Sequence, residues 1–189
     1  MKVDIIKVGM LETNCYIVSE GERAVVIDPG DEAEKIAAFL DESGLKVEYI
    51  FLTHSHFDHI GALAAIKKKT CAPVAVGEKD KEFIKIPAET LLHGGETLSA
   101  AGMDFKVIAT PGHTRGGVCY IACGAMFSGD TLFLESIGRS DLPGGSFEEL
   151  RASVKGLFEL KGDLTVYPGH GDATTLSHER ACNPFKDVL

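Results

Sequence analysis

The stretch of sequence that decides the fold is Thr53-His54-Ser55-His56-Phe57-Asp58-His59. It follows directly on the apolar run 47–52, which predicts a buried strand, and the residues 60–66 predict a helix behind it. The histidines and the aspartate therefore lie on a turn at the carboxyl end of a strand, where open α/β sheets place their ligand sites. Four potential metal ligands within six residues form a dense cluster, because the whole chain has only seven histidines.

The spacing of these four side chains indicates two metal ions rather than one. Because side chains alternate along an extended turn, His54 and His56 project to the same side. Asp58 and His59 lie where the chain bends into the helix, so they face a second point. Zinc takes nitrogen, oxygen and sulfur ligands, and a catalytic zinc keeps one position open for water. Four residues cannot complete two such sites, so other parts of the chain must supply further ligands.

Three later turns at strand ends supply candidates for these further ligands. His113 lies on a Pro-Gly turn after the predicted strand 105–109, and Asp130 follows the predicted strand 125–128. His170 lies on a second Pro-Gly turn, after the predicted strand 164–167. A glycine beside each candidate lets the backbone come close to a crowded site. The seven candidate metal ligands are His54, His56, Asp58, His59, His113, Asp130 and His170.

Length and composition favour one globular domain. The 189 residues are 44% hydrophobic, enough to bury a sizeable core, so we expect a single domain over residues 1–189. The net charge of −9 argues against nucleic acid or an anionic membrane as a partner. No apolar run approaches the ~20 residues that span a bilayer. No signal-like apolar stretch follows Met1, so we expect a cytoplasmic protein.

The cysteines are odd in number and lack metal-binding spacing; they are Cys15, Cys71, Cys119, Cys123 and Cys182. Thiols in a cytoplasmic protein stay reduced, so we predict five free cysteines. Cysteines of this kind are usually small, buried and inert, and we expect none of them to have a catalytic role.

The predicted elements form two similar halves. In each half a strand ends on an aspartate, a helix follows, and a later strand ends on a histidine. The first half contains predicted strands 3–8, 14–19, 24–28, 47–52 and 73–76 and a helix over 32–42. The second half contains predicted strands 105–109, 118–121, 125–128 and 164–167 and a helix over 146–160. This pseudo-repeat predicts a mixed α/β (α+β) fold, a four-layer αββα sandwich with two sheets face to face and helices outside.

Some polar residues have a weaker assignment or none. Residues 77–96 are polar and mixed, which indicates a short helix and a loop without recognisable chemistry. We expect His93 in that segment to be exposed and His178 to lie on a surface helix. Asp28, at a strand end, has two open interpretations. It either accepts a hydrogen bond from a ligand histidine and fixes its tautomer, or it caps local backbone.

Taken together, the motifs resemble those of the metallo-β-lactamase superfamily. The resemblance spans residues 1 to about 185 and rests on Thr-His-Ser-His-Phe-Asp-His, Gly-His-Thr, Gly-Asp and Pro-Gly-His in this order. It implies the αββα fold and two divalent metal ions, with zinc favoured and iron or manganese as alternatives. It assigns His54, His56 and His113 to one ion and Asp58, His59 and His170 to the other, with Asp130 bridging. Zinc β-lactamases generally have a cysteine at the position of Asp130, which disfavours antibiotic hydrolysis.

Within the superfamily the chain resembles glyoxalase II, the hydroxyacylglutathione hydrolases. Residues 138–145, Gly-Arg-Ser-Asp-Leu-Pro-Gly-Gly, and residues 179–185, Glu-Arg-Ala-Cys-Asn-Pro-Phe, are in keeping with that branch. Full-size members carry a helical C-terminal extension with basic residues that hold glutathione, whereas this chain stops at Leu189. We therefore expect the compact, mainly prokaryotic type, with a small thioester substrate that is glutathione-derived or similar. The sequence leaves the oligomeric state open.

The resemblance also implies a mechanism. Two metal ions ~3.5–4 Å apart that share a water lower its pKa to near ~7, and the bridging hydroxide attacks the thioester carbonyl. Asp58 would act catalytically by binding a metal and orienting this nucleophile. Arg139 lies nine residues after Asp130, in a loop close to the metals. Its guanidinium would bind a substrate carboxylate, and the open alternative is a structural ion pair with Asp141.

Two other functions remain open at the level of the sequence. A related branch, the persulfide dioxygenases, uses a single iron at the positions of His54, His113 and Asp130 and shares the Gly-Arg-Ser/Thr-Asp segment. Other hydrolases of the fold, including lactonases, form the second alternative. Nucleases are disfavoured because the chain has no basic stripe.

Overall fold

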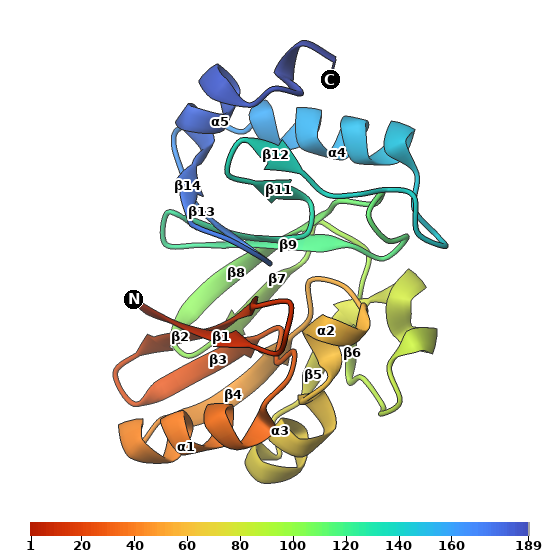
Figure 1. Cartoon of the computed structure of the whole chain (residues 1–189). Helices are drawn as coiled ribbons and strands as arrows, with labels where there is room; N and C mark the ends of the chain where they lie inside the picture. Colours follow the sequence, from red (N-terminus) through yellow and green to blue (C-terminus); the bar gives the residue numbers. More distant parts are fainter. Residues whose placement is uncertain (189) are drawn as a thin grey trace.

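Two β-sheets lie face to face between two layers of helices (Figure 1). The structure is a computed structural model, and it describes residues 1–188 of the chain. Helices α1 (Ala33–Ser43) and α3 (Leu63–Thr70) lie outside the first sheet, and α4 (Phe147–Phe158) and α5 (Leu176–Cys182) lie outside the second. The predicted four-layer αββα sandwich is therefore confirmed.

The first sheet contains the strands of the N-terminal half, in the order β1-β2-β3-β4-β5-β6. Their bounds are β1 (Lys2–Val8), β2 (Thr13–Glu20), β3 (Arg23–Ile27), β4 (Lys46–Phe51), β5 (Val74–Gly77) and β6 (Thr90–Leu92). Strands β1 to β3 pair antiparallel, and β3 to β6 pair parallel. Because β3, β4 and β5 run in one direction, the turns that follow them meet at one edge of the sheet.

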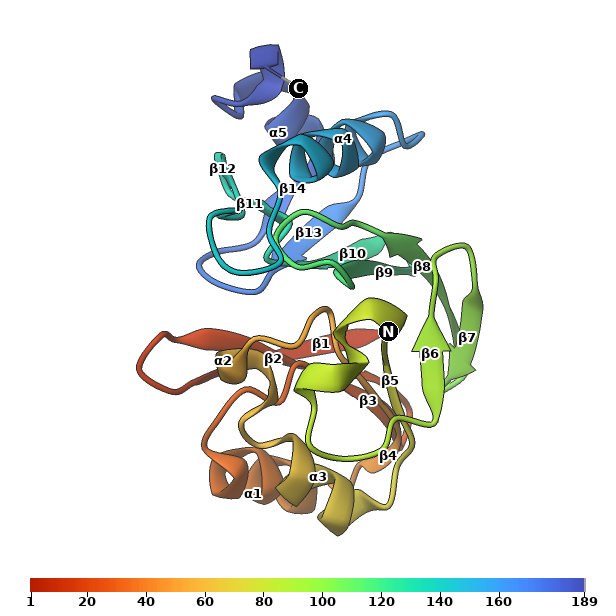
Figure 2. The same ribbon diagram turned by 90° about the vertical axis from the view of Figure 1, so that its right-hand side faces the viewer.

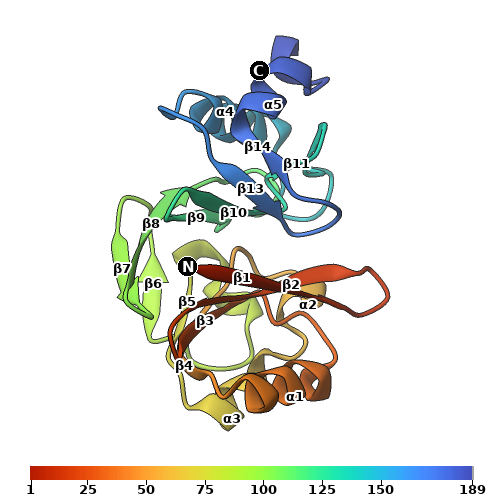
Figure 3. The same ribbon diagram turned by 90° about the vertical axis from the view of Figure 1, so that its left-hand side faces the viewer.

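The second sheet contains the strands of the C-terminal half, in the order β14-β13-β10-β9-β8-β7. Their bounds are β7 (Thr97–Ala100), β8 (Met103–Ala109), β9 (Val118–Ala122), β10 (Ala125–Gly129), β13 (Thr165–Pro168) and β14 (Thr174–Thr175). A separate ribbon pairs β11 (Leu132–Phe133) with β12 (Ser136–Ile137). The chain passes from the first sheet to the second at the edge where β6 and β7 lie (Figures 2 and 3).

The predicted pseudo-repeat is present in the topology. In the first half α1 connects the parallel strands β3 and β4, and in the second half α4 connects the parallel strands β10 and β13. Helix α4 begins where the Ser146 hydroxyl accepts a hydrogen bond from the Glu149 amide, a typical N-cap. Helix α1 ends at Gly44, whose left-handed backbone suits glycine.

Strand β3 shows how one strand serves two cores. Ala24 and Val26 belong to the core under α1 and α3, whereas Val25 and Ile27 belong to the core between the sheets. All four side chains are fully buried, since successive side chains of a strand point to opposite faces and both faces are covered. Asp28 follows the last residue of this strand directly, and its side chain is buried as well.

Aromatic rings fill the core between the two sheets. The ring of Phe51 lies 5.1 Å from that of Phe105 and 4.8 Å from that of Tyr120, so one residue of β4 contacts two strands of the other sheet. The Tyr120 hydroxyl donates to the carbonyl oxygen of Leu52 at 2.7 Å. Truncating a buried ring of this kind costs about 3–5 kcal/mol of stability. These contacts fix the end of β4, from which the histidine turn departs.

Two predictions about local structure were wrong. The predicted helix over 60–66 is divided into α2 (Phe57–Ile60) and α3, because the chain at Gly61 and Ala62 contacts the turn after β3. The Ala62 amide donates to the Pro29 carbonyl at 3.0 Å, and a Cβ on Gly61 would lie 2.3 Å from the Gly30 carbonyl oxygen. Within residues 77–96 the predicted short helix is present as the 3-10 helix η1 (Glu78–Phe83), whereas strand β6 lies where a loop was predicted. Strand β7 was not predicted.

All five cysteines are free, as predicted. Only Cys15 and Cys119 are buried, so the expectation of burial was wrong for the other three. Cys71 ends α3 and Cys123 lies in the β9–β10 turn, both with left-handed backbone, and Cys182 lies at the end of α5. Such positions at the ends of elements are open to solvent. Among residues 1–188, no helix combines the length and apolar character needed to cross a membrane.

Candidate metal centre

The seven candidate ligands come together where the carboxyl ends of strands from both sheets face each other. The turn after β4 carries His54 and His56, and α2 carries Asp58 and His59. The turns after β8, β10 and β13 carry His113, Asp130 and His170. Two loops, one from each sheet, are joined directly, since the Val118 amide donates to the Thr53 carbonyl at 2.8 Å.

The first donor set consists of His54, His56 and His113, whose donor atoms all lie within 4.8 Å of one another. The Nδ1 atom of His56 is 2.8 Å from the Nε2 atom of His113. His54 is buried, and its Nε2 atom has no hydrogen-bond partner in the part of the chain that the structure describes. Three imidazole nitrogens therefore lie close together, including those of the two histidines that the spacing placed on one side.

The second donor set consists of Asp58, His59 and His170, again with donor atoms within 4.8 Å of one another. Oδ2 of Asp58 lies 3.2 Å from Nε2 of His170 and 3.5 Å from Nε2 of His59. The Thr13 hydroxyl donates to the same Asp58 oxygen at 3.0 Å. Strand β2 thus orients a carboxylate that the sequence alone placed near the second metal position.

Asp130 lies between the two donor sets. Its Oδ1 atom is 3.4 Å from Nε2 of His59, and its Oδ2 atom is 3.4 Å from Nε2 of His113 and 3.6 Å from Nε2 of His170. Oδ1 is buried without a hydrogen-bond partner among the described residues. A Cβ on Gly169 would lie 2.1 Å from that oxygen, so only glycine leaves room for the carboxylate.

The donor atoms fit two divalent metal ions. Leaving a buried polar atom unsatisfied costs about 1–3 kcal/mol, and here two such atoms, Nε2 of His54 and Oδ1 of Asp130, face the same cluster. A cation in each donor set would satisfy both atoms. Imidazole nitrogens with carboxylate oxygens are a suitable donor combination for zinc, iron and manganese.

Hydrogen bonds on the far side of the imidazole rings hold the histidines in place. Nδ1 of His59 lies 2.9 Å from Oδ2 of Asp28, and Nδ1 of His54 lies 3.1 Å from the Thr53 hydroxyl. Nδ1 of His113 donates to the Arg139 carbonyl at 2.7 Å, and Nδ1 of His170 donates to the Leu11 carbonyl at 3.0 Å. Each contact directs the opposite Nε2 atom into the cluster, where it can bind a metal once it carries no proton.

Asp28 has the role of the first interpretation, because it accepts a hydrogen bond from a ligand histidine. Its carboxylate also accepts from the Thr53 amide at 2.7 Å and from the Thr53 hydroxyl at 2.6 Å. Asp28 forms a third close group with His54 and His59. Since its oxygens are already occupied by Thr53 and His59, we assign it to positioning rather than to metal binding.

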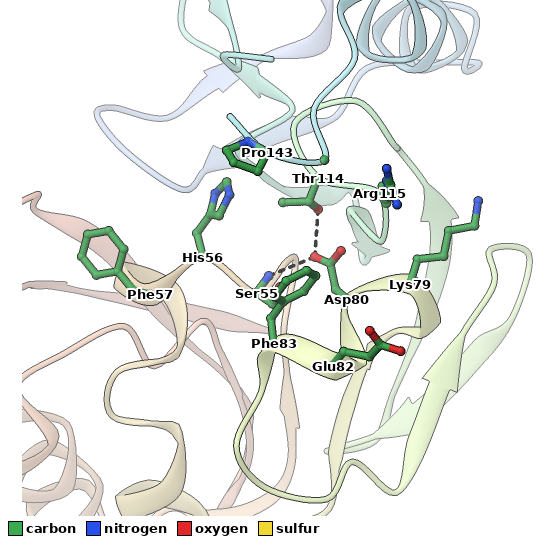
Figure 4. Close-up of a pocket in the computed structure, with 11 residues that line it drawn as sticks. Ser55, His56, Phe57, Lys79, Asp80, Glu82, Phe83, Thr114, Arg115 and Pro143 are labelled. Atoms are coloured by element: carbon green, nitrogen blue, oxygen red, sulfur yellow. Dashed lines mark hydrogen bonds between the residues drawn. The ribbon is translucent and has the colours of Figure 1, made fainter. Parts of the chain in front are cut away.

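Sequence reasoning missed Asp80, which is buried beside the first donor set. Its Oδ2 atom accepts from the Ser55 amide at 3.1 Å and the Thr114 hydroxyl at 2.8 Å (Figure 4). Its Oδ1 atom accepts from the Gly116 amide at 2.7 Å. Ser55 lies between two ligands of the first set and Thr114 follows the third, so Asp80 joins the loops of both sheets. The polar segment 77–96 gave no signal for this role apart from the acidic residue itself.

His54 and His56 of the first set are neutral near pH 7 in the metal-free protein, because the pKa of each is lowered. Burial lowers the pKa of His54 well below the usual histidine range, and the neighbouring His59 adds to this effect. Burial also lowers the pKa of His56, and His113 acts in the same direction. A metal ion can therefore enter at His54 and His56 without displacing a proton from either residue.

The second set holds protons in the metal-free protein. Burial alone would lower the pKa of His59, but the carboxylates of Asp28 and Asp130 outweigh it and raise the pKa to about 10. A hydrogen bond to Asp58 raises the pKa of His170. Burial would raise the pKa of Asp130, but the charge of the nearby His59 holds it far below the usual range. A metal ion entering this set must displace the proton of His59.

Arg139 contributes its backbone to the site, whereas its side chain points to a different partner. The backbone carbonyl accepts the hydrogen bond from His113 described above. The exposed guanidinium forms two hydrogen bonds of 2.8 Å with the carboxylate of Asp141. The ion pair with Asp141 was the open alternative to substrate binding. His93 is exposed and His178 lies on α5, and neither belongs to a donor set within residues 1–188.

Comparison with known proteins identifies relatives along the whole chain. The family model for the metallo-beta-lactamase superfamily matches residues 8–170. The hydroxyacylglutathione hydrolase GloC of Haemophilus influenzae is 34% identical over 207 residues, which cover 98% of this chain and 98% of GloC. The BLEG-1 B3 metallo-beta-lactamase superposes with a TM-score of 0.94 at 34% identity, covering 98% of this chain and 99% of the other.

Two further solved structures bear on the metal and the reaction. TTHA1623 in a di-iron-bound form has a TM-score of 0.88 at 39% identity, covering 97% of this chain and all of the other. ETHE1 from Myxococcus xanthus has a TM-score of 0.87 at 28% identity, covering 97% of this chain and 84% of the other. The sequence similarity therefore includes proteins with different names and different reactions around one fold.

Proposed function

Because the chain belongs to the metallo-beta-lactamase superfamily, we propose that it is a metal-dependent hydrolase of small acyl thioesters with two divalent ions bound. The observation that carries the proposal is the arrangement of two three-residue donor sets on either side of Asp130. The relative named as a hydroxyacylglutathione hydrolase covers nearly the whole chain and supports a thioester as substrate. The proposed substrate is glutathione-derived or carries a similar thiol.

In the proposed enzyme each donor set would hold one ion, and Asp130, which lies between the sets, would serve both. His54, His56 and His113 would hold one ion, and Asp58, His59 and His170 would hold the other. When bound, such ions polarise a carbonyl oxygen and lower the pKa of water. Zinc is the ion that we propose, with iron, as in the di-iron relative, or manganese as alternatives.

The chain's own residues then orient the reacting groups. Asp58 is fixed at Oδ2 by the Thr13 hydroxyl, and in the proposed mechanism its carboxylate also accepts a hydrogen bond from the attacking water. His56 lies at the boundary between the donor sets and an open pocket, so the thioester carbonyl reaches the centre past this residue. The leaving thiolate is stable near neutral pH, so the reaction needs no strong general acid from the chain.

The proposal also covers macromolecular partners and the cellular compartment. A chain with a net charge of −9 repels nucleic acid and anionic membranes, so we propose neither as a partner. The five free cysteines support a reducing compartment, and we propose the cytoplasm.

Two of the similar structures keep other reactions as alternatives, which should be tested together with thioester hydrolysis. ETHE1 is a relative over 97% of this chain, which keeps the mononuclear iron persulfide dioxygenase as an alternative, with iron at His54, His113 and Asp130. BLEG-1 is named as a B3 metallo-beta-lactamase, which keeps β-lactam hydrolysis as an alternative to be tested. Lactone hydrolysis is a third alternative within the same fold.

One substrate panel tests the proposal against these alternatives. Protein loaded with zinc, and in parallel with iron, is given S-D-lactoylglutathione, glutathione persulfide with oxygen, nitrocefin and a simple lactone. We expect kcat/KM for the thioester to exceed those for the other compounds by about 100-fold, which is about 2.7 kcal/mol of discrimination. Oxygen uptake with the persulfide, or nitrocefin turnover, that matched or exceeded thioester turnover would overturn the proposal. The variant Asp130→Ala should be inactive on all four compounds.

A further inference from the structure

A pocket of about 350 Å³ opens beside the first donor set (Figure 4). Its inner end is formed by His56, Ser55 and Thr114. A cavity of this volume is within the range of small-ligand sites. Because His56 is itself a candidate metal ligand, a molecule in this pocket would have one end at the metal centre.

Apolar side chains from both halves of the chain form the walls of this pocket. Phe83 lies at the end of η1 and Phe57 at the start of α2, both in the N-terminal half (Figure 4). Pro143, from the loop before α4, lies on the other side. Phe57 and Phe83 are 75% and 64% exposed, so water contacts most of both rings. Exposed aromatic rings gathered at one pocket mark a binding surface for a partly apolar molecule.

Two cations, Lys79 and Arg115, also line the pocket, and both side chains are exposed. Neither forms an ion pair or a side-chain hydrogen bond with any residue in the range 1–188, whereas Lys67 and Lys69 both pair with carboxylates. Glu82 is the exposed acid on the pocket lining. The other acid, Asp80, is buried and already accepts the three hydrogen bonds described above.

We propose that Arg115 and Lys79 bind an anionic group on the thiol moiety of the substrate, and that Phe83 and Pro143 contact the apolar part of that moiety. The proposal rests on the thioesterase function proposed above, and it gives the substrate an orientation. The acyl carbon lies at the metal centre beyond His56, and the thiol arm runs outward along the pocket. The planar fork of arginine suits both carboxylate and phosphate, so either anion satisfies the chemistry.

Arg115 differs from Arg139 in whether its guanidinium already has a partner within the described part of the chain. The guanidinium of Arg139 already forms two hydrogen bonds with Asp141, so binding a substrate anion would require that pair to open. Arg115 has no such partner among the described residues and lies on the pocket lining. The structure therefore favours Arg115 over Arg139 as the residue that selects an anionic thiol.

The kinetic test uses thioesters that share one acyl group and differ in the thiol. The thiols are glutathione with its carboxylates, 4′-phosphopantetheine with its phosphate, and neutral N-acetylcysteamine. Arg115→Ala and Lys79→Ala should each raise KM for one of the anionic thioesters by about threefold to tenfold, and leave the neutral one unchanged. Lys68→Ala is the matched control, because Lys68 is exposed on α3 and outside this pocket. Equal losses on charged and neutral thioesters, or no losses, would overturn the proposal.

A binding measurement tests the proposed anion site independently of whether the protein cleaves thioesters. Calorimetry with S-hexylglutathione and its diethyl ester needs no turnover, so it decides the matter even if no thioester is cleaved. Metal-loaded wild-type protein should bind the free acid about tenfold more tightly than the ester. This preference should fall to near parity in Arg115→Ala combined with Lys79→Ala, and it should weaken at high salt because exposed charges are screened. Equal affinity for acid and ester in the wild type, or no binding of either, would contradict the assignment.

Discussion

The Nδ1 atom of His59 lies 2.9 Å from Oδ2 of Asp28, and both side chains are buried. Asp28 ends β3 and His59 lies on α2, so the contact ties the end of one strand to the helix that follows the next strand. The carboxylate accepts from Thr53 at the same time. One buried aspartate therefore orients a candidate ligand of the second set and holds the start of the histidine turn.

This contact predicts the effect of Asp28→Asn. The asparagine has one acceptor oxygen in place of two, so it cannot accept from the Thr53 amide, the Thr53 hydroxyl and His59 together. We expect the affinity of the second donor set for metal to fall about tenfold to 100-fold, as for other residues that orient metal ligands. Competition with a chromophoric chelator measures the loss. Asp41→Asn is the control, because Asp41 is exposed and pairs only with Lys69. Unchanged affinity in Asp28→Asn would remove the positioning role.

Asp80→Asn should weaken the first donor set instead. The asparagine cannot accept hydrogen bonds from Ser55, Thr114 and Gly116 together, so at least one buried donor loses its acceptor. The free energy of unfolding should fall by about 1–3 kcal/mol, and the metal held by the first set should dissociate more readily.

The measurement for Asp80 separates positioning from general stability. Chelator competition and urea unfolding are run on the same sample, with Asp104→Asn as the control, since Asp104 is exposed and bonds only to the Ser99 hydroxyl. Added zinc should restore activity to folded Asp80→Asn protein. A variant that is less stable yet binds both metals with wild-type affinity would show that Asp80 serves the fold alone.

Metal uptake should release a proton from the second donor set. The pKa of His59 is raised to about 10, above the usual value for histidine, so the metal-free protein carries this proton below pH 10. The proton must leave when Nε2 binds a metal, and affinity therefore rises with pH up to about 10. Zinc titration of metal-free protein at pH 7.5 in buffers of different ionisation enthalpy counts the protons. The absence of proton release over both equivalents of zinc would contradict this assignment of charge.

Arg139→Ala should have a small and unselective effect. Its exposed pair with Asp141 is screened by solvent and contributes little to stability, and the backbone carbonyl that holds His113 remains in the variant. We expect KM to change by less than about threefold, equally for anionic and neutral thioesters. Steady-state kinetics of Arg139→Ala and Arg115→Ala on the same thioesters provide the comparison. A selective loss on the anionic thioester in Arg139→Ala alone would return substrate binding to Arg139.

The candidate ligands could be predicted from the sequence because each lies on a local signal. His54, His56, Asp58 and His59 follow one apolar run, and His113 lies on a Pro-Gly turn after another. Parallel strands bring such turns to one sheet edge, so local pattern and topology together place the site. The two-sheet architecture followed from the repeat of strand, helix and strand in each half.

The positioning contacts could not be predicted in the same way. Asp80 accepts from donors 25, 34 and 36 residues away, and no local pattern marks such a residue. The break between α2 and α3 has a similar cause, since Gly61 and Ala62 contact the turn at Pro29 and Gly30, which is distant in the sequence. The sequence left the partner of Arg139 open, because its guanidinium can bind the carboxylate of Asp141 or a carboxylate of a substrate equally well.

A measurement of activity as a function of the number of bound metal ions tests the central claim most directly. Metal-free protein is titrated with zinc, and bound metal by elemental analysis and hydrolysis of S-D-lactoylglutathione are measured on the same samples. Two donor sets joined by Asp130 predict that activity reaches its maximum at about two ions per chain, and that Asp130→Ala retains neither the activity nor the full metal content. Full thioesterase activity at one firmly bound ion per chain would contradict the dinuclear account.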